Sequence, residues 1–132
     1  MGQPVARQSD PVTGTDTHIV LVPSPSGATP TPMPLPFSGK IMSNTSTDVF
    51  VNDLPAATVG STAQNIPPHL PPPGTSFGVP PTNTGQVLKG STTVLVNGKG
   101  IARVGDQVTT CNDPTPAPTS AVAAGSSDVF AA

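Results

Sequence analysis

Three side chains of this 132-residue chain stand out for the metal chemistry they could do: its two histidines, His18 and His69, and its single cysteine, Cys111. Imidazole nitrogen and thiolate sulfur are ligands that Zn²⁺ prefers, at about 2.0–2.1 Å and about 2.3 Å. Taken alone, such a histidine is more often solvated and such a cysteine a small core residue. A metal site is therefore indicated only if the fold brings the three together.

An internal repeat is the feature that relates these side chains to one another. The segment STDVFVNDLPAATVGS (46–61) aligns without a gap with STTVLVNGKGIARVGD (91–106), and eight of the sixteen positions are identical. Each copy reads as a strand with alternating valines, a two-residue turn that begins at Asn52 or Asn97, and a second short strand. The sequence thus predicts two equivalent β-hairpin units.

A third unit is divided between the two ends of the chain. PVARQSD (4–10) matches only the second half of the unit, and SSDVF (126–130) matches only the first half. Joined, they predict a closed β-structure with pseudo-threefold symmetry, in which strand pairing fastens the termini and leaves no exposed sheet edge. An ordinary small sandwich of hairpins is the alternative, but it would not explain why the two ends complement each other.

The three metal-type side chains occupy one place each after these units. His18 and His69 lie eight residues after the ends of the first and second units, and Cys111 lies five residues after the end of the third. Threefold closure would bring the three loops together at one end of the axis. We therefore predict a structural Zn²⁺ site of His18, His69 and Cys111 at a narrow apex, where a metal replaces a hydrophobic core. The fourth ligand is left open, as water or a loop group.

A catalytic zinc with an open coordination position is the competing interpretation of the same three ligands. It would need a general base, for which Asp16, Asp106 and Asp113 are available. No HExxH, Ser/His/Asp or paired-carboxylate arrangement accompanies them. We therefore expect a protein that is not an enzyme.

Composition supports rigid β-structure and excludes several classes of partner. Nineteen prolines and 13 glycines argue against a helical bundle, and we expect no helix longer than two turns. A net charge of −2 with five Lys and Arg gives nucleic-acid binding no electrostatic basis. The longest apolar run, IVLV (19–22), is far below the ~20 residues that span a bilayer, and the N-terminus lacks a signal peptide pattern. A single cysteine excludes an internal disulfide framework.

The stretch TTVLVNGKGIARVGD closely resembles the unit of the PAAR-repeat family, named for Pro-Ala-Ala-Arg. The name-giving tetrad stands here as PVAR (4–7), PAAT (55–58) and GIAR (100–103), and the order of half, full, full and half units is similar to the family's own. The resemblance covers nearly the whole chain and implies one cone-shaped, all-β domain over residues 1–132. It also implies zinc at the apex, with His18, His69 and Cys111 as ligands.

The sequence departs from the family pattern in three respects. The family commonly offers three histidines with one cysteine, whereas this chain has two histidines. Ser61 stands where the other units end in aspartate. The Pro-rich insertions 23–39 and 70–85 are long, and we expect them to wrap a face of the cone without regular structure, or to form adaptable surfaces for cargo or a neighbouring tail component.

The resemblance implies a structural spike-tip protein of a contractile injection system, either type VI secretion or a phage-tail-like particle. It would cap and sharpen a trimeric central spike (VgrG-like or phage-spike-like) for membrane puncture, with strands 46–51, 91–96 and 126–130 against the open strands of that partner. The alternatives are an adaptor that loads a noncovalent toxin effector onto the spike and a metal-dependent hydrolase of an envelope component. We expect synthesis and assembly in the cytoplasm, delivery outside the cell or into a target cell, and contact with the target membrane on firing.

Overall fold

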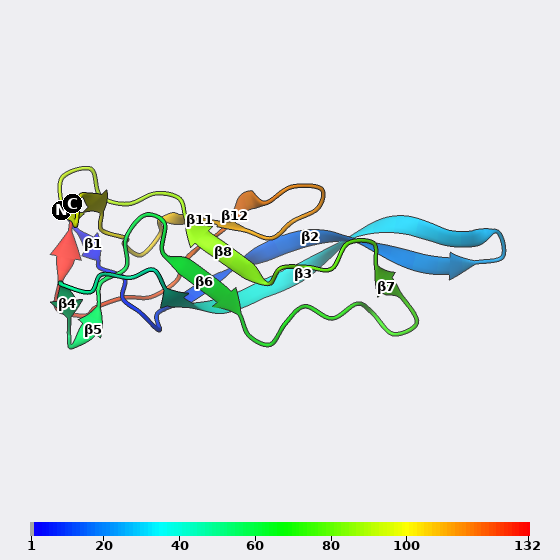
Figure 1. Ribbon diagram of the computed structural model, residues 1–132, viewed down its shortest axis with the longest axis horizontal. Helices are drawn as coiled ribbons and strands as arrows, with labels where there is room; N and C mark the ends of the chain where they lie inside the picture. Colours follow the sequence, from blue (N-terminus) through cyan, green and yellow to red (C-terminus); the bar gives the residue numbers. More distant parts are fainter. Residues whose placement is uncertain (1) are drawn as a thin grey trace.

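The computed structural model describes residues 2–132, and these residues form strands and turns with no helix (Figure 1). The all-β prediction is therefore confirmed. Glycine and proline interrupt every stretch long enough for a helix, and the frequent valines and threonines favour extended backbone. In the part of the chain that is described, no helix is long and apolar enough to cross a membrane.

Three short hairpins form one end of the molecule, which we call the base (Figure 1). They pair β4 (Phe50–Val51) with β5 (Leu54–Pro55), β9 (Leu95–Val96) with β10 (Lys99–Gly100), and β1 (Gln3–Pro4) with β13 (Phe130–Ala131). Asn52 and Asn97 both have φ of 53°, and the residues after them are also left-handed, as a two-residue type I′ turn requires. The two chain ends thus pair with each other as the strands of the two complete hairpins do.

A ring of backbone hydrogen bonds joins the three units at the centre of the base. The Ala6 N–H donates to the Ala102 carbonyl (2.8 Å), that of Ala102 to Ala57 (2.9 Å), and that of Ala57 to Ala6 (3.0 Å). All three alanines are fully buried. Because each unit donates to one neighbour and accepts from the other, the ring closes on itself and marks a pseudo-threefold axis.

Each unit is followed by a longer hairpin, and the three hairpins close into a six-stranded barrel. The strands are β2 (Pro11–Ser24), β3 (Gly27–Ser43), β6 (Thr62–Asn65), β8 (Thr84–Val87), β11 (Gln107–Thr110) and β12 (Ala117–Val122). They pair in the order β2-β3-β6-β8-β11-β12, and β12 pairs with β2 again, so the barrel closes. A short strand, β7 (Ser76–Phe77), is added to the outside of β2. Closure of this kind removes sheet edges from the body of the molecule.

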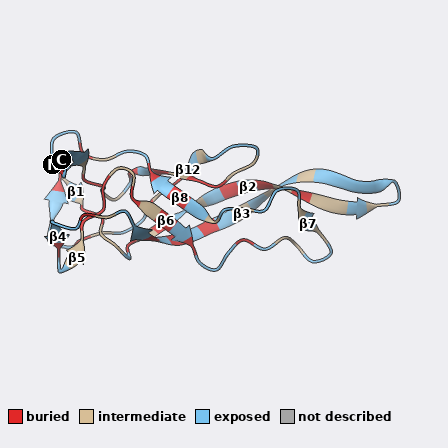
Figure 2. Cartoon of the chain, in the orientation of Figure 1, coloured by how far each residue is buried: buried red, intermediate tan, exposed pale blue. Residues whose placement is uncertain are grey.

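The core fills the barrel and the part of the base next to it (Figure 2). It is made of small and β-branched side chains with two larger ones, and its members include Val12, Phe37, Ile41, Ala63, Val87, Val108 and Val122. A second cluster, centred on Val5, Val51, Val96 and Ile101, packs between the hairpins of the base. The narrow interior therefore needs few large residues, in keeping with a composition of four Phe and no Trp or Tyr.

The β2–β3 hairpin is much longer than the other two and projects beyond the barrel (Figure 1). Its register runs without a break from the pair of Pro11 and Lys40 to that of Ser24 and Gly27. The expectation of irregular structure for the insertion 23–39 was therefore wrong, because prolines at alternate positions still allow the residues between them to pair with β2. The insertion 70–85 is mostly irregular, apart from β7 and the start of β8.

Candidate metal centre

Four buried side chains meet inside the molecule: Asp16, His18, His69 and Cys111, with one ligand atom of each lying within 4.8 Å of the others. Asp16 and His18 are two residues apart on β2 and so point to the same face. His69 lies in the loop after β6, and Cys111 follows β11 directly. The structure thus brings together the three side chains that the repeat singled out and adds a carboxylate.

His18 is the member of the cluster whose polar atoms lack partners. Its side chain is 1% exposed, and neither Nδ1 nor Nε2 has a hydrogen-bond partner. Oδ2 of Asp113 lies 3.5 Å from Nδ1 without forming a hydrogen bond to it. A buried polar group without a partner is costly in free energy, so the ring fits a site that a metal ion would complete.

Asp16 is fully buried and directs its two carboxylate oxygens to different neighbours. Oδ1 receives hydrogen bonds from Thr110 Oγ1 (2.5 Å), Thr119 Oγ1 (3.2 Å) and Asn112 Nδ2 (3.4 Å). Oδ2 lies 2.8 Å from His69 Nε2 and 3.4 Å from Cys111 Sγ. One oxygen is therefore held by the surrounding strands, and the other is aimed into the cluster, as in the outer support of many metal ligands.

Burial raises the pKa of the Cys111 thiol to about 11, and the nearby Asp16 carboxylate contributes to the same shift. Without a metal the thiol is therefore protonated at neutral pH and donates its hydrogen to Asp16. A bound cation reverses this preference, because it stabilises the thiolate directly and the proton is released on binding.

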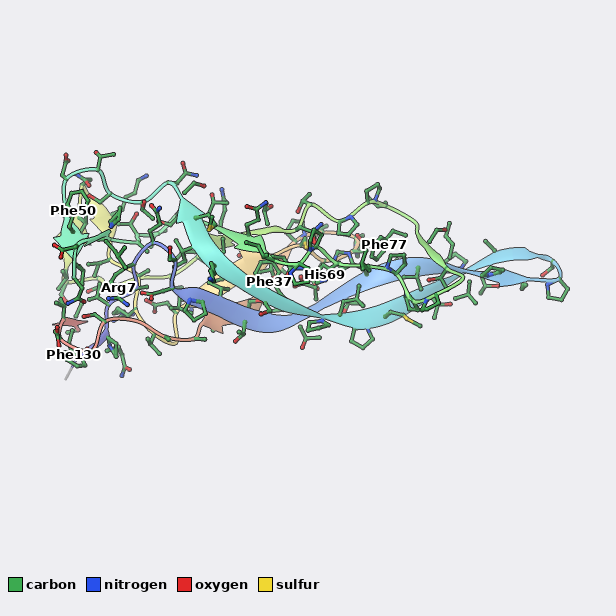
Figure 3. The ribbon with its side chains drawn as sticks, turned by 90° about the horizontal axis from the view of Figure 1, so that it is seen from below. Arg7, Phe37, Phe50, His69, Phe77 and Phe130 are labelled. Atoms are coloured by element: carbon green, nitrogen blue, oxygen red, sulfur yellow. The ribbon has the colours of Figure 1, made fainter. Side chains whose placement is uncertain are left out.

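Aromatic rings cover the cluster. Phe77 of β7 packs edge-on against His18 with ring centroids 5.8 Å apart, and Phe37 of β3 packs in the same way against His69 at 6.3 Å. Figure 3 places His69 between the base and the end of the long hairpin. The apex position that we expected was wrong, because β2 and β3 continue beyond the ligand loops.

Two imidazoles, one thiol and one carboxylate are a donor set that suits a divalent transition metal of the zinc type. A thiolate and a carboxylate together balance the charge of a divalent ion, which lowers the cost of burying it. The repeat could not reveal Asp16, since no equivalent residue follows the other two units. The available signal was its place two residues before His18, on the same face of one strand.

The closed pseudo-threefold barrel, the flat base of three hairpins and the internal ligand cluster define a class of small, tapered β-proteins with a metal-type centre. Residues 77–132 match a family model, described as PAAR motif. This segment holds the second full repeat, Cys111 and the closing half unit, and the match supports a PAAR-repeat protein. No curated protein matches the chain.

Proposed function

We propose that this protein is the structural tip of the trimeric central spike of a contractile injection system, which it caps and sharpens for membrane puncture. The observation that carries the proposal is an apolar triad on the base. Phe50, Leu95 and Phe130 occupy equivalent positions in the three units and are 57%, 59% and 55% exposed. Figure 3 shows Phe50 and Phe130 at the end of the molecule opposite the long hairpin.

Three equivalent apolar side chains on a pseudo-threefold axis fit a partner with true threefold symmetry. A second set, Val49, Val94 and Val129, adds exposed apolar surface at 37–39% exposure beside the triad. Clusters of exposed apolar side chains in a small protein mark interaction surfaces. A trimeric spike (VgrG-like or phage-spike-like) would offer each side chain of the triad the same contact.

Hydrogen bonds between neighbouring units hold the triad in place. Asn52 Nδ2 donates to Asp128 (3.0 Å), and Asn97 Nδ2 donates to Asp48 (2.7 Å), at equivalent positions of two unit boundaries. At the third boundary the Ser91 hydroxyl donates to the backbone carbonyl of Ala132. The base is thus cross-linked on all three sides, as a rigid platform for thrust would need.

The metal in this proposal is a structural Zn²⁺ held by Asp16, His18, His69 and Cys111. Its ligands come from the hairpin or loop that follows each of the three units, so the ion would pin together segments far apart in the sequence. Four protein donors match the filled set of structural zinc sites, whereas catalytic sites commonly have three. This donor set supports a mechanical role over hydrolysis.

An adaptor role for a noncovalent toxin effector is the second candidate. The observation that favours it is exposed apolar surface in and beside the insertion 70–85, where Leu70 is 75% and Val79 is 62% exposed. Assembly in the cytoplasm and delivery beyond the producing cell belong to both proposals.

Docking to the trimeric spike protein of the same injection system tests the main proposal. The triple variant with Phe50→Asp, Leu95→Asp and Phe130→Asp should lose copurification with the spike, because three carboxylates would have to be buried in the contact. Leu88→Asp is the control, since Leu88 is 46% exposed but lies outside the triad. Undiminished binding of the folded triple variant would contradict the proposal.

A further inference from the structure

The long hairpin ends in a segment that projects beyond the barrel (Figure 1), with Val20 and Phe37 buried where it leaves the core. We call residues 19–37, which contain its end, the ribbon. The pairing of β2 and β3 continues six residues beyond His18 to Ser24, a length of about 20 Å at 3.3–3.4 Å per residue. The ribbon is the element farthest from the base (Figure 1).

The ribbon contains no ionisable side chain. From Ile19 to Phe37 there is no Asp, Glu, Lys, Arg or His, and the nearest titratable residues along the chain are His18 and Lys40. Its side chains are apolar residues, prolines and hydroxyl residues. An exposed two-stranded ribbon in water is normally protected by charged side chains, which keep it soluble and unpaired.

The outer edge of β3 also lacks backbone donors along the ribbon. In an antiparallel strand every second N–H points away from the partner. The Ser38 N–H points away from β2, because it donates to Asn65 Oδ1 at 2.9 Å. The preceding residues in that series are Pro36, Pro34, Pro32 and Pro30, and all four are exposed. Proline has no N–H, so this edge presents carbonyl groups alone from Thr29 to Phe37.

The outer edge of β2 has its donors occupied or removed in the same way. The Thr17 N–H donates to Asn112 Oδ1 (2.7 Å), the Ile19 N–H donates to Asp113 Oδ2 (2.9 Å), and Leu21 pairs with Ser76 of β7. The next residue in this series is Pro23. The outward-facing positions of β2 therefore have no free N–H group as far as Pro23. Those of β3 have none from Pro30 to Pro36.

A donor-free edge could serve to prevent pairing with other strands or to lower the cost of leaving water. Lysine or proline on an edge strand achieves the first in water. Proline removes the donor without adding a charge. In a bilayer every unsatisfied N–H or carbonyl and every charged side chain is costly, so an edge without N–H groups and charges leaves water at a lower cost, which its outward carbonyls alone contribute.

We propose that the ribbon enters the apolar layer of an uncharged phospholipid bilayer as a lipid-binding element. The inference rests on the proposed function, in which the end opposite the docked base meets the target membrane. Beyond the pair of Leu21 with Ser76 of β7, the ribbon continues for three residues to Ser24, a length of about 10 Å, which is less than half of a hydrocarbon core of about 30 Å. It therefore enters one leaflet and does not span the bilayer.

A single tryptophan tests this in the full-length protein, since the chain has no Trp or Tyr of its own. We expect Val22→Trp to show a blue-shifted emission with phosphatidylcholine vesicles, quenching by bromine-labelled acyl chains, and no loss of binding at high salt. Leu88→Trp, outside the ribbon, should show neither effect. An unshifted Val22→Trp protein, or an equal shift of the control, would overturn the proposal.

Two further changes in the Val22→Trp background separate the effects of charge and donors. Thr29→Lys should weaken partition into vesicles at least tenfold, and Pro32→Ala with Pro34→Ala should weaken it severalfold by returning two outward N–H groups. Leu88→Lys is the matched charge control. The proposal would be overturned if the alanine variant partitioned as before and self-associated in water. The prolines would then serve only to prevent pairing with other strands.

Spike docking of the same proteins keeps this proposal separate from the proposed function. A Val22→Trp protein that docks normally but ignores vesicles would overturn lipid entry alone. A protein that enters vesicles but never docks would overturn the spike-tip function and leave the lipid affinity of the ribbon standing. Circular dichroism and metal content verify that each variant is folded.

Discussion

At the residue scale, the number of protein ligands in the proposed metal site, three or four, depends on Asp16. Its Oδ2 faces both His69 and Cys111, while three donors hold Oδ1. An acid in this position supplies the second negative charge beside the thiolate, which a third histidine would not. In the proposed metal site, this carboxylate from the strand of His18 would take the place of the third histidine that the family resemblance implies.

The first prediction is that Asp16→Asn weakens zinc binding at least tenfold, because the amide is neutral and a poor zinc ligand. Competition with a chelator of known affinity measures the change. Asp48→Asn is the control, since that exposed carboxylate lies in the base. Zinc retention equal to that of the unchanged protein would show that Asp16 is only a hydrogen-bond partner of His69.

A second residue-scale prediction concerns Ser9, which has a left-handed φ of 78° where the other two units have Gly60 and Gly105, both at 91°. Ser9→Gly should raise the free energy of unfolding by about 0.5–1 kcal/mol, since glycine adopts this backbone without steric cost. Chemical denaturation measures it.

The reverse change, Gly60→Ser, provides the matching control. A Cβ at Gly60 would meet no atom within 4 Å, so only the backbone conformation can oppose it. We expect a loss of about 1 kcal/mol. A stabilised Gly60→Ser protein would contradict the explanation from backbone strain.

At the scale of the elements, the turn that ends each unit is the same in all three despite different residues. Arg7 and Arg103 direct their backbone N–H and guanidinium groups to Asp10 and Asp106. In the middle unit the Thr58 N–H donates to the Ser61 hydroxyl at 2.9 Å, so Ser61 keeps the backbone contact. The middle unit therefore has two linked replacements: Ser61 stands in place of aspartate, and Thr58 stands in place of arginine three residues earlier.

The third prediction is that Ser61→Asp alone destabilises the fold by about 2 kcal/mol or more, because Ser61 is fully buried and a carboxylate there would lack a cation. Adding Thr58→Arg should restore a large part of the loss, as in the outer units. Thermal denaturation of the two single variants and the double variant measures the coupling. Losses that simply add would contradict it.

The sequence predicted the elements that repeat and missed those that do not. One repeat alignment predicts the hairpin units, the divided third unit and the meeting of His18, His69 and Cys111. An error in that alignment would have made all three predictions wrong. The long β2–β3 hairpin has no counterpart in the other units. Its proline content is typical of a loop. Prolines are compatible with a strand only where the missing N–H groups would face away from the partner, and the sequence does not show which strand is the partner.

The prediction that the metal site lies at the apex was wrong for the same reason. Loops after equivalent units do meet near the axis, but the axis does not end there when one hairpin is extended. Asp16 belongs to that extended strand, and its role depends on a side-chain direction that spacing from the repeat could not give.

At the scale of the whole molecule, closure of the base depends on a hairpin without a turn. Gln3 pairs with Ala131 and Pro4 with Phe130, in the same register as Leu54 with Val51 and Pro55 with Phe50. In the complete hairpin two residues, Asn52 and Asp53, connect the strands. In the third hairpin the equivalent positions are Ala132 and Gly2, and Figure 1 shows the chain ends side by side.

The last prediction is that a peptide bond from residue 132 to Gly2, without any linker, completes this turn. With Ala132→Asn the joint reads Asn-Gly, as at Asn97 and Gly98, and it suits a type I′ turn. Cyclisation should raise the free energy of unfolding by up to about 4–5 kcal/mol, because it restricts the unfolded chain. The linear Ala132→Asn protein is the control, and metal content should be equal in both. A cyclic protein less stable than the linear one would show that the ends do not meet in hairpin register.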